Sequence, residues 1–294
     1  MDTTRSPTPP TDPPPRLSAE AAALVSGPAA GVHPERRAVG EDETVRANRA
    51  DWDAYADEYQ ATHGPYLGDA GFLWCPEGVR EDELGALGTV RGRTVLEIGC
   101  GAGQCSRWLV QRGARAVGLD VSRRQLQHSR RIDDEHDTRV PVVCASGAAL
   151  PFAARTFDTV FSAFGSLQFV ADEQALVRDV ARVLRPGGRF AFSITHPTRW
   201  MFPDDPGPDG LVVSSSYFDR TPYVEVDDSD GSTRYVEHHR TVGDWVRALD
   251  AGGFRLRDLV EPEWPADLDR TWGGWSRTRG LTMPGTAIYV ADLG

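Results

Sequence analysis

A short apolar segment that runs directly into a glycine-rich turn is the feature that most restricts the fold of this chain. Residues 94–98 read Thr-Val-Leu-Glu-Ile, and residues 99–103 read Gly-Cys-Gly-Ala-Gly. The apolar run is typical of a buried strand, and residues 104–112 are predicted to form a helix. Glycines at such a turn let the backbone approach a ligand, and the first amides of the helix face it. The segment therefore predicts a nucleotide-type site at the end of a strand.

Strand and helix patterns alternate after this turn. Ser122 and Asp172 are suited to cap two of the helices, and the sequence Pro186-Gly187-Gly188 is expected to stop the second of them. This alternation is typical of a parallel sheet that is covered by helices on both faces. Apolar runs predict further strands at 116–120, 140–144, 159–163 and 189–195.

The two ends of the chain differ from this middle part. Residues 1–40 hold eight of the 21 prolines and few large apolar residues, so we expect a disordered tail there. After residue 41, one helix face is predicted to carry Trp52, Tyr55, Ala56 and Tyr59. Beyond the fifth strand, the patterns predict a hairpin at 223–226 and 233–239, a helix at 242–251, and two final strands at 254–260 and 286–291.

Composition argues against several classes of protein. The chain has 294 residues and a formal net charge of −11, which makes it a poor partner for nucleic acid. No apolar run approaches the roughly 18 residues of a membrane span, and the first residues lack the apolar stretch of a secretory signal, so we expect a cytoplasmic protein. All 32 basic residues are arginine, so a mechanism that uses lysine as a Schiff-base nucleophile or as a general base is excluded. The four cysteines form no CxxC pair, so we expect reduced thiols and no metal site.

Two acidic residues sharpen the prediction of a nucleotide-type site. Glu97 precedes the first glycine of the turn by two positions, and Asp120 ends the next predicted strand. A carboxylate at the second position can accept hydrogen bonds from both hydroxyls of a ribose. The GxGxxG pattern of dinucleotide sites does not fit, because Gln104 or Ser106 stands where the third glycine is needed. A dinucleotide-dependent oxidoreductase is therefore disfavoured.

The segments from about 94 to 195 resemble class I S-adenosylmethionine-dependent methyltransferases. The resemblance implies a Rossmann-like α/β fold whose seven-stranded sheet is mostly parallel with the last strand antiparallel, with helices on both faces and an added hairpin after strand five. It implies one domain over 41–294, with a helical lid (41–90), a cofactor-binding core (91–196) and an insertion that forms the acceptor pocket (197–240). The matching segments are 95–103 (VLEIGCGAG), 117–122 (VGLDVS), 149–152 (ALPF) with 156–160 (TFDTV), and 184–188 (LRPGG).

The resemblance also implies the cofactor S-adenosyl-L-methionine and the product S-adenosyl-L-homocysteine. Glu97 would orient the methionine end of the cofactor, and Asp120 would bind the ribose. The family commonly has Asp-Ala before the Leu-Pro-Phe stretch, where this chain has Ser146 and Gly147, so a serine hydroxyl or a backbone carbonyl would accept from the adenine amino group instead. No metal ligand is predicted. The candidate cofactor-binding residues are Tyr55, Tyr59, Glu97, Gly99, Cys100, Gly101, Gln104, Asp120, Val121, Gln125, Ser146, Gly147, Ala148 and Ala163.

Three histidines are candidates for a general base. His196 directly follows the fifth predicted strand, at the sheet edge where ligands bind in such folds. His238 and His239 are adjacent on a predicted strand, so their side chains point to opposite faces and at most one can reach a pocket. Phe164 follows the fourth predicted strand, and we expect it to be a wall beside the reacting methyl group.

The sequence thus predicts an enzyme that transfers a methyl group to O, N or C of a small organic acceptor by in-line displacement, without a metal. Two alternatives are a methyltransferase that acts on a protein or peptide and a non-catalytic S-adenosylmethionine-binding protein. Base-modifying methyltransferases carry an Asn/Asp-Pro-Pro-aromatic motif after strand four, where this chain has Ser162-Ala163-Phe164-Gly165. A nucleic-acid acceptor is therefore disfavoured.

Overall fold

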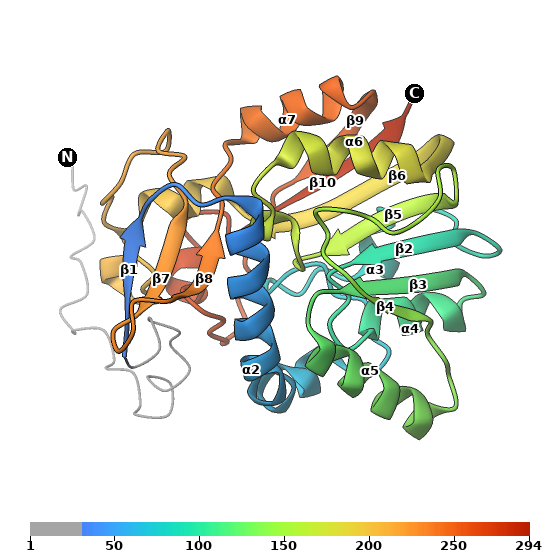
Figure 1. Ribbon diagram of the computed structural model, residues 1–294, viewed down its shortest axis with the longest axis horizontal. Coiled ribbons are helices and arrows are strands. Elements are labelled where there is room, and N and C mark those ends of the chain that lie inside the picture. Colours follow the sequence, from blue (N-terminus) through green and yellow to red (C-terminus); the bar gives the residue numbers. More distant parts are fainter. Residues whose placement is uncertain (1–30) are drawn as a thin grey trace, which may run out of the picture.

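A computed structural model of the protein describes residues 31–294, and its centre is a seven-stranded sheet (Figure 1). The strand order is β4-β3-β2-β5-β6-β10-β9. The first five strands of this order pair in parallel, whereas β10 is antiparallel to both of its neighbours. This topology confirms the predicted mostly parallel sheet with an antiparallel last strand. The strands are β2 Thr94–Ile98, β3 Arg115–Asp120, β4 Val142–Cys144, β5 Phe157–Ala163, β6 Leu184–Thr195, β9 Phe254–Val260 and β10 Thr286–Leu293.

Helices cover both faces of this sheet because the side chains of its central strands alternate between two apolar layers. Phe190 and Phe192 of β6 pack in the layer that contains helices α6 and α7, while Ala191 between them belongs to the layer on the other side, which contains Trp108 of α4. The longer helices are α4 Gln104–Gln111, α5 Arg123–His136, α6 Glu173–Val183 and α7 Val242–Ala251. The short helices are α3 Glu81–Leu84, α8 Arg277–Gly280 and the 3-10 turns η1 Leu167–Phe169, η2 Pro197–Met201 and η3 Pro208–Leu211.

Helix α6 ends before the proline and glycines that are expected to stop it. Its last residue is Val183, and Leu184 already pairs with Phe157 of β5. Residues 186–188 lie inside β6, where the pairing with β5 shifts register between Phe157 and Thr159. The Pro-Gly-Gly sequence therefore makes an irregularity at the start of a strand, a place where such residues are tolerated.

A second, three-stranded antiparallel sheet lies beside the main domain (Figure 1). Strands β7 (Tyr223–Asp227) and β8 (Thr233–Glu237) form the predicted hairpin, and β1 (Val32–Arg36) pairs with β7. The prediction of disorder up to residue 40 is therefore wrong for this segment, because its backbone groups are satisfied by β7. Pro34 is compatible with this strand because β1 is at the edge of the sheet. The rest of the predicted tail, residues 1–30, lies outside the described residues.

Helix α2 (Glu41–Leu67) stands between the two sheets (Figure 1). It carries the predicted aromatic face and continues past residue 60. Asn48, the only asparagine in the sequence, is buried where α2 meets β8. Its amide nitrogen donates to the carbonyl oxygen of Val236, and its amide oxygen accepts from the backbone N–H of Val236, both at 2.9 Å. The Asn48 side chain therefore satisfies the N–H and the carbonyl group of Val236, which lies on the edge strand β8, and it fixes α2 to the small sheet.

Candidate cofactor site

The turn after β2 adopts backbone conformations that its glycines allow. Gly99, Gly101 and Gly103 have φ angles of 74°, 51° and 75°, in the left-handed region that disfavours other residues. Space is a second restriction at Gly99, where an added Cβ would lie 2.9 Å from the backbone carbonyl carbon of Gly165 and 2.8 Å from Cβ of Ser166. The turns after β2 and β5 are therefore in close contact, and a side chain at Gly99 would separate them.

Glu97 lies near the end of β2, with only 3% of the residue exposed. Its Oε2 accepts hydrogen bonds from the backbone N–H of Ser106 at 2.9 Å and from the Ser106 hydroxyl at 2.5 Å. Burial raises the pKa of this carboxyl to about 8, although the two hydrogen bonds from Ser106 act in the opposite direction. Glu97 thus holds a proton at neutral pH until a cationic group approaches it.

Asp120 ends β3 and connects two turns of the site. Its Oδ2 accepts from the backbone N–H of Gly101 and its Oδ1 accepts from that of Ser122, each at 2.8 Å. Burial raises the pKa of this carboxyl to about 6, against the effect of the two backbone hydrogen bonds. These contacts fix the carboxylate beside the glycine turn.

Helix α2 closes over these elements through three glutamine side chains. The amide nitrogen of Gln60 donates to Oε1 of Gln125 at 2.8 Å, and its Oε1 accepts from the amide nitrogen of Gln104 at 3.1 Å. Gln104 begins α4 and Gln125 lies in the first turn of α5. Asp53 adds a second contact between α2 and the start of α5, since its Oδ1 accepts from the Ser122 hydroxyl at 2.7 Å.

Glu97, Asp120, the glycine turn and the three glutamines line one cavity at the carboxyl ends of β2, β3 and β5. Its walls come from α2, the glycine turn, the turn at 146–147 and the segment 163–170 after β5. Open α/β sheets bind ligands at this edge. The carboxyl groups of its described lining are those of Glu97 and Asp120, and no arginine or histidine lines it. The cavity therefore suits a ligand that carries positive charge and hydroxyl groups.

A family model described as a methyltransferase domain matches residues 95–188, which include β2, β3, β5 and the glycine turn. The match covers the strand ends and turns that line the cavity, but not helix α2. Residues 95–188 thus carry a methyltransferase domain. The family resemblance predicted from the sequence is confirmed.

Three known methyltransferases are similar to parts of this chain. Methyltransferase GfsG from Streptomyces halstedii is 38% identical over 40% of this chain and 43% of its own length. A demethylmenaquinone methyltransferase from Tropheryma whipplei is 34% identical over 40% of this chain and 48% of its own. The structure of an S-adenosylmethionine-dependent methyltransferase from Mesorhizobium loti is 28% identical, with a TM-score of 0.57 over 71% of this chain and 94% of that one. The chain spans about half the length of the curated relatives it matches.

Most of the predicted cofactor-binding residues lie together in the cavity of the methyltransferase domain. Tyr55 and Ala148 are outside its lining: Tyr55 packs beside Trp52 and Tyr59, with ring centroids 6.2 and 6.0 Å away. The backbone N–H of Ala148 donates to the Ser146 hydroxyl at 3.1 Å. The predicted residues that line the cavity are Tyr59, Glu97, Gly99, Cys100, Gly101, Gln104, Asp120, Val121, Gln125, Ser146, Gly147 and Ala163.

Sequence reasoning missed part of this lining. Trp52 shares the predicted aromatic helix face, and its ring lies 6.0 Å from that of Phe169, which also lines the cavity. Phe164, which the sequence suggested as a wall, does line the cavity, with a left-handed φ of 53° and its N–H donating to the Ser193 hydroxyl at 2.7 Å. Gln60 belongs to no pattern that would mark it. The helical stripe was a signal for Trp52, whereas Phe169 and Gln60 needed the fold.

The structure places the three candidate histidines away from the cavity. His196 contacts Glu261 through Nε2 and the Thr198 hydroxyl through Nδ1, each at 2.8 Å. His238 lies 3.1 Å from the hydroxyl of Thr44, measured from Nε2, and lines a separate hollow. Burial lowers the pKa of all three imidazoles, that of His238 to about 4. None of the three lines the cofactor cavity, so a role as general base stays a prediction.

Three further features concern residues 31–294: the cysteines, groups of side chains that could bind a metal, and helices that could cross a membrane. All four cysteines are free, and Cys100 and Cys105 line the cavity with thiol pKa values raised by burial. Within residues 31–294, no cluster of three or more His, Cys, Asp or Glu side chains is arranged to hold a metal ion. The helices in this range include none with the length and apolar character needed to cross a membrane.

Proposed function

We propose that the protein is an S-adenosylmethionine-dependent methyltransferase that acts on a small organic acceptor. The observation that carries the proposal is that Glu97, Asp120 and the glycine turn line one cavity at the ligand-binding edge of the sheet. This is the arrangement expected of a site for a nucleoside linked to an amino acid.

The charges of the cavity support this cofactor over one that contains phosphate. S-adenosylmethionine carries a sulfonium and an ammonium against a single carboxylate, so its net charge is positive. The described lining contains two carboxyl groups and neither arginine nor histidine. Such a wall attracts a cation and repels a pyrophosphate, because the low dielectric of a buried site strengthens both interactions.

Six polar side chains of the lining have a role in this proposal. The Glu97 carboxylate would receive the ammonium group, and Asp120 would accept from the ribose hydroxyls. The three bridged glutamines (Gln60, Gln104 and Gln125) would bind the carboxylate end through their amide N–H groups. Ser166, whose hydroxyl is buried and without a hydrogen-bond partner in the described structure, offers a free polar atom at the end of β5.

The reaction requires the acceptor to be aligned with the methyl group more than it requires chemical activation of either reactant. When bound, S-adenosylmethionine supplies a methyl group on a positive sulfur, so the displacement requires no Lewis acid. Trp52, Phe164 and Phe169 would exclude water and hold the acceptor in line with the methyl group. Their aromatic faces also favour a positive charge. This apolar wall suits a small organic acceptor.

Calorimetric titration with S-adenosylmethionine, S-adenosylhomocysteine and NADH tests the proposal. We expect the first two to bind near micromolar concentrations and NADH not to bind. Transfer of an isotope-labelled methyl group to a panel of small phenols, amines and carboxylic acids would then separate an enzyme from a non-catalytic binding protein. Binding of NADH alone, or of none of the three, would overturn the proposal.

A further inference from the structure

Phe164 has a backbone conformation that is unusual for a large side chain. Its φ of 53° lies in the left-handed region, where the Cβ of an L-residue comes too close to the backbone. Among residues 31–294, the other non-glycine residues with a positive φ are Asp137 and Arg155, and both are exposed. Phe164 instead is half-buried and lines the cofactor cavity. Strained residues of this kind are concentrated at sites that bind or convert ligands.

The chain turns sharply at Phe164 because its next residue passes against the glycine turn. A Cβ added to Gly165 would lie 2.6 Å from the carbonyl oxygen of Gly99, so the two backbones are in close contact. A glycine at position 164 would make this turn without strain. The sequence has a phenylalanine there, although its backbone conformation is unfavourable. The aromatic ring therefore explains the residue type better than the turn does.

The hydroxyl group of Ser193 holds Phe164 in this conformation. Ser193 is fully buried on β6, where it pairs with Ala163 of β5. Its Oγ accepts from the backbone N–H of Phe164 at 2.7 Å and donates to the carbonyl oxygen of Trp74 at 2.6 Å. A hydroxyl can accept and donate at the same time, whereas the methyl group of alanine can do neither. Ser193 thus connects the end of β5 to a buried segment on the other side of β6.

The proposed cofactor would place its sulfur close to Phe164. In the proposed function, Glu97 receives the ammonium group and Asp120 the ribose, and the sulfur joins these two parts of the molecule. Glu97 lies on β2, paired with Gly118 of β3 on one side and with Phe161 of β5 on the other. The sulfur is therefore expected over the end of β2, beside the glycine turn. Phe164 follows Phe161 by three positions and begins the turn that lies against those glycines.

We propose that the ring of Phe164 contacts the sulfonium group and distinguishes S-adenosylmethionine from S-adenosylhomocysteine, and that Ser193 is a positioning residue that holds this ring. The inference rests on the proposed function. The two ligands differ by one methyl group and by the positive charge on sulfur. Glu97 and Asp120 are assigned to parts that both ligands share, so discrimination needs a group at the sulfur itself.

An aromatic ring suits this role because its face attracts a positive charge without carrying a charge of its own. The attraction exists while the sulfur is a sulfonium and is lost once the methyl group has been transferred, because the product is a neutral thioether. The ring of Phe164 would thus favour the methyl donor over the product at the same site. A leucine at this position would fill a similar space without this preference.

Calorimetric titration with S-adenosylmethionine and with S-adenosylhomocysteine tests the role of Phe164. F164L removes the aromatic face and keeps a large apolar side chain on the same left-handed backbone. We expect F164L to bind S-adenosylmethionine about fivefold more weakly, the size of one cation–π contact. Its affinity for S-adenosylhomocysteine should stay within about twofold of the wild-type value, because the thioether has no charge for the ring to attract.

The role of Ser193 is tested through the ratio of the two affinities, S-adenosylmethionine over S-adenosylhomocysteine. S193A should lower this ratio about threefold, because the backbone of Phe164 loses its hydrogen-bond partner. S193T keeps the hydroxyl and should retain the wild-type ratio. In the F164L background, S193A should leave the ratio unchanged, because Ser193 acts through the ring. If S193A does not fold, S193C takes its place, since a thiol forms weaker hydrogen bonds.

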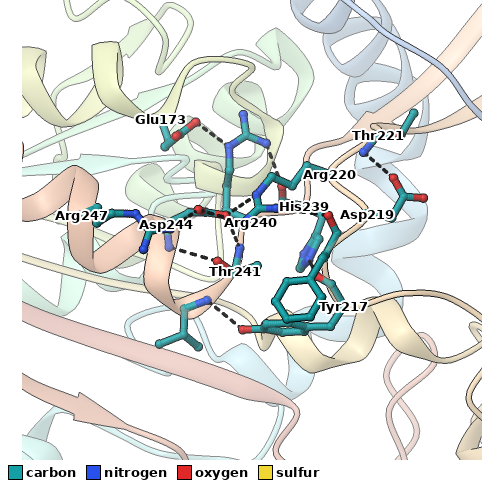
Figure 2. Close-up of polar contacts among 12 residues, drawn as sticks. Glu173, Tyr217, Asp219, Arg220, Thr221, His239, Arg240, Thr241, Asp244 and Arg247 are labelled. Atoms are coloured by element: carbon teal, nitrogen blue, oxygen red, sulfur yellow. Dashed lines mark hydrogen bonds and ion pairs between the residues drawn. The ribbon is translucent and has the colours of Figure 1, made fainter.

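T241A separates a change in this ratio from a general loss of stability. Thr241 caps helix α7, and its hydroxyl accepts from the backbone N–H of Asp244 at 3.1 Å (Figure 2). Neither residue lines the cofactor cavity. Loss of such a cap destabilises a helix, so T241A should melt at a lower temperature than the wild-type protein. Its ratio of affinities should nevertheless equal that of the wild-type protein.

Three outcomes would contradict these assignments, each in a different way. The role of Phe164 is overturned if F164L weakens both ligands equally or leaves both affinities unchanged. The role of Ser193 is overturned if its variant without the hydroxyl keeps the wild-type ratio, or if that variant still lowers the ratio in the F164L background. Failure of the wild-type protein to bind either ligand would instead overturn the proposed function.

Discussion

The backbone N–H of Gly101 donates a hydrogen bond of 2.8 Å to Oδ2 of Asp120, which connects the glycine turn after β2 to the end of β3. The two residues come from neighbouring parallel strands, whose carboxyl ends meet at the same edge of the sheet. Gly101 and Asp120 depend on each other for this hydrogen bond. Gly101 needs its left-handed φ of 51° to present the N–H, and Asp120 needs the N–H to keep a buried carboxylate in place.

Replacement of Asp120 by alanine should weaken the binding of S-adenosylmethionine by about 1.5–3 kcal/mol, the range for hydrogen bonds to a charged group. The loss has two causes, because the carboxylate both accepts from the ribose and positions the glycine turn. Isothermal titration measures it directly. D134A, at an exposed position on α5, is the matched control and should bind normally. An unchanged affinity of D120A would mean that β3 does not carry the ribose contact.

Binding of S-adenosylmethionine should release protons at pH 7. Burial raises the pKa of Glu97 to about 8, so the free protein holds a proton there that an ammonium group displaces. The affinity should therefore rise between pH 6 and 7.5, and the binding heat at pH 7 should depend on the ionisation enthalpy of the buffer. E97Q should bind more weakly and without release of a proton from this site. Equal heats in phosphate and Tris for the wild-type protein would contradict the assignment.

The same carboxyl should affect the stability of the unliganded protein. In the unfolded chain a glutamate has its ordinary pKa of 4.5, whereas in the folded protein Glu97 titrates near 8. The folded state thus binds more protons between these values, so its free energy of unfolding falls as pH rises from about 4.5 to 8. E97Q lacks this contribution. Urea denaturation at pH 5 and pH 8 should show a smaller loss for E97Q than for the wild-type protein.

Replacement of Gln60 by alanine should loosen helix α2 over the cavity. The substitution removes the bridge to Gln104 and Gln125, and each lost hydrogen bond costs about 1 kcal/mol. Hydrogen–deuterium exchange of residues 52–67 should become faster, and the cofactor should bind about tenfold more weakly. E58A, an exposed position on the same helix, should leave both quantities unchanged. A Q60A variant with wild-type exchange would show that the glutamine bridge does not hold the helix.

The main sheet and much of the cofactor site could be predicted from the sequence because their signals are local. The run Thr94–Ile98 is apolar and short, and the glycines after it are needed for their backbone conformations. Glu97 and Asp120 follow from their places at strand ends. Local signals of this kind remain valid once the chain folds, since they describe what each segment can do by itself.

The remaining features depend on contacts between distant segments. The strand Val32–Arg36 contains a proline and few apolar residues, and it is ordered by its pairing with β7. Phe169 reaches Trp52 only when η1 and α2 come together. His196 follows strand β6 at the edge of the sheet where a general base is expected. Its imidazole contacts Glu261, 65 positions later, and does not line the cofactor cavity. No pattern within one segment encodes these pairs.

Replacement of Asn48 by alanine should destabilise the protein by about 1–3 kcal/mol. The two hydrogen bonds of this side chain satisfy the N–H and the carbonyl oxygen of Val236, and their loss leaves buried backbone groups without partners. Chemical denaturation measures the change, with R49A as the matched control at an exposed position on the same helix. N48D keeps an acceptor for the N–H but no donor for the carbonyl, so its stability should also fall. If N48A unfolds at the wild-type denaturant concentration, α2 is held to the small sheet by its apolar contacts alone.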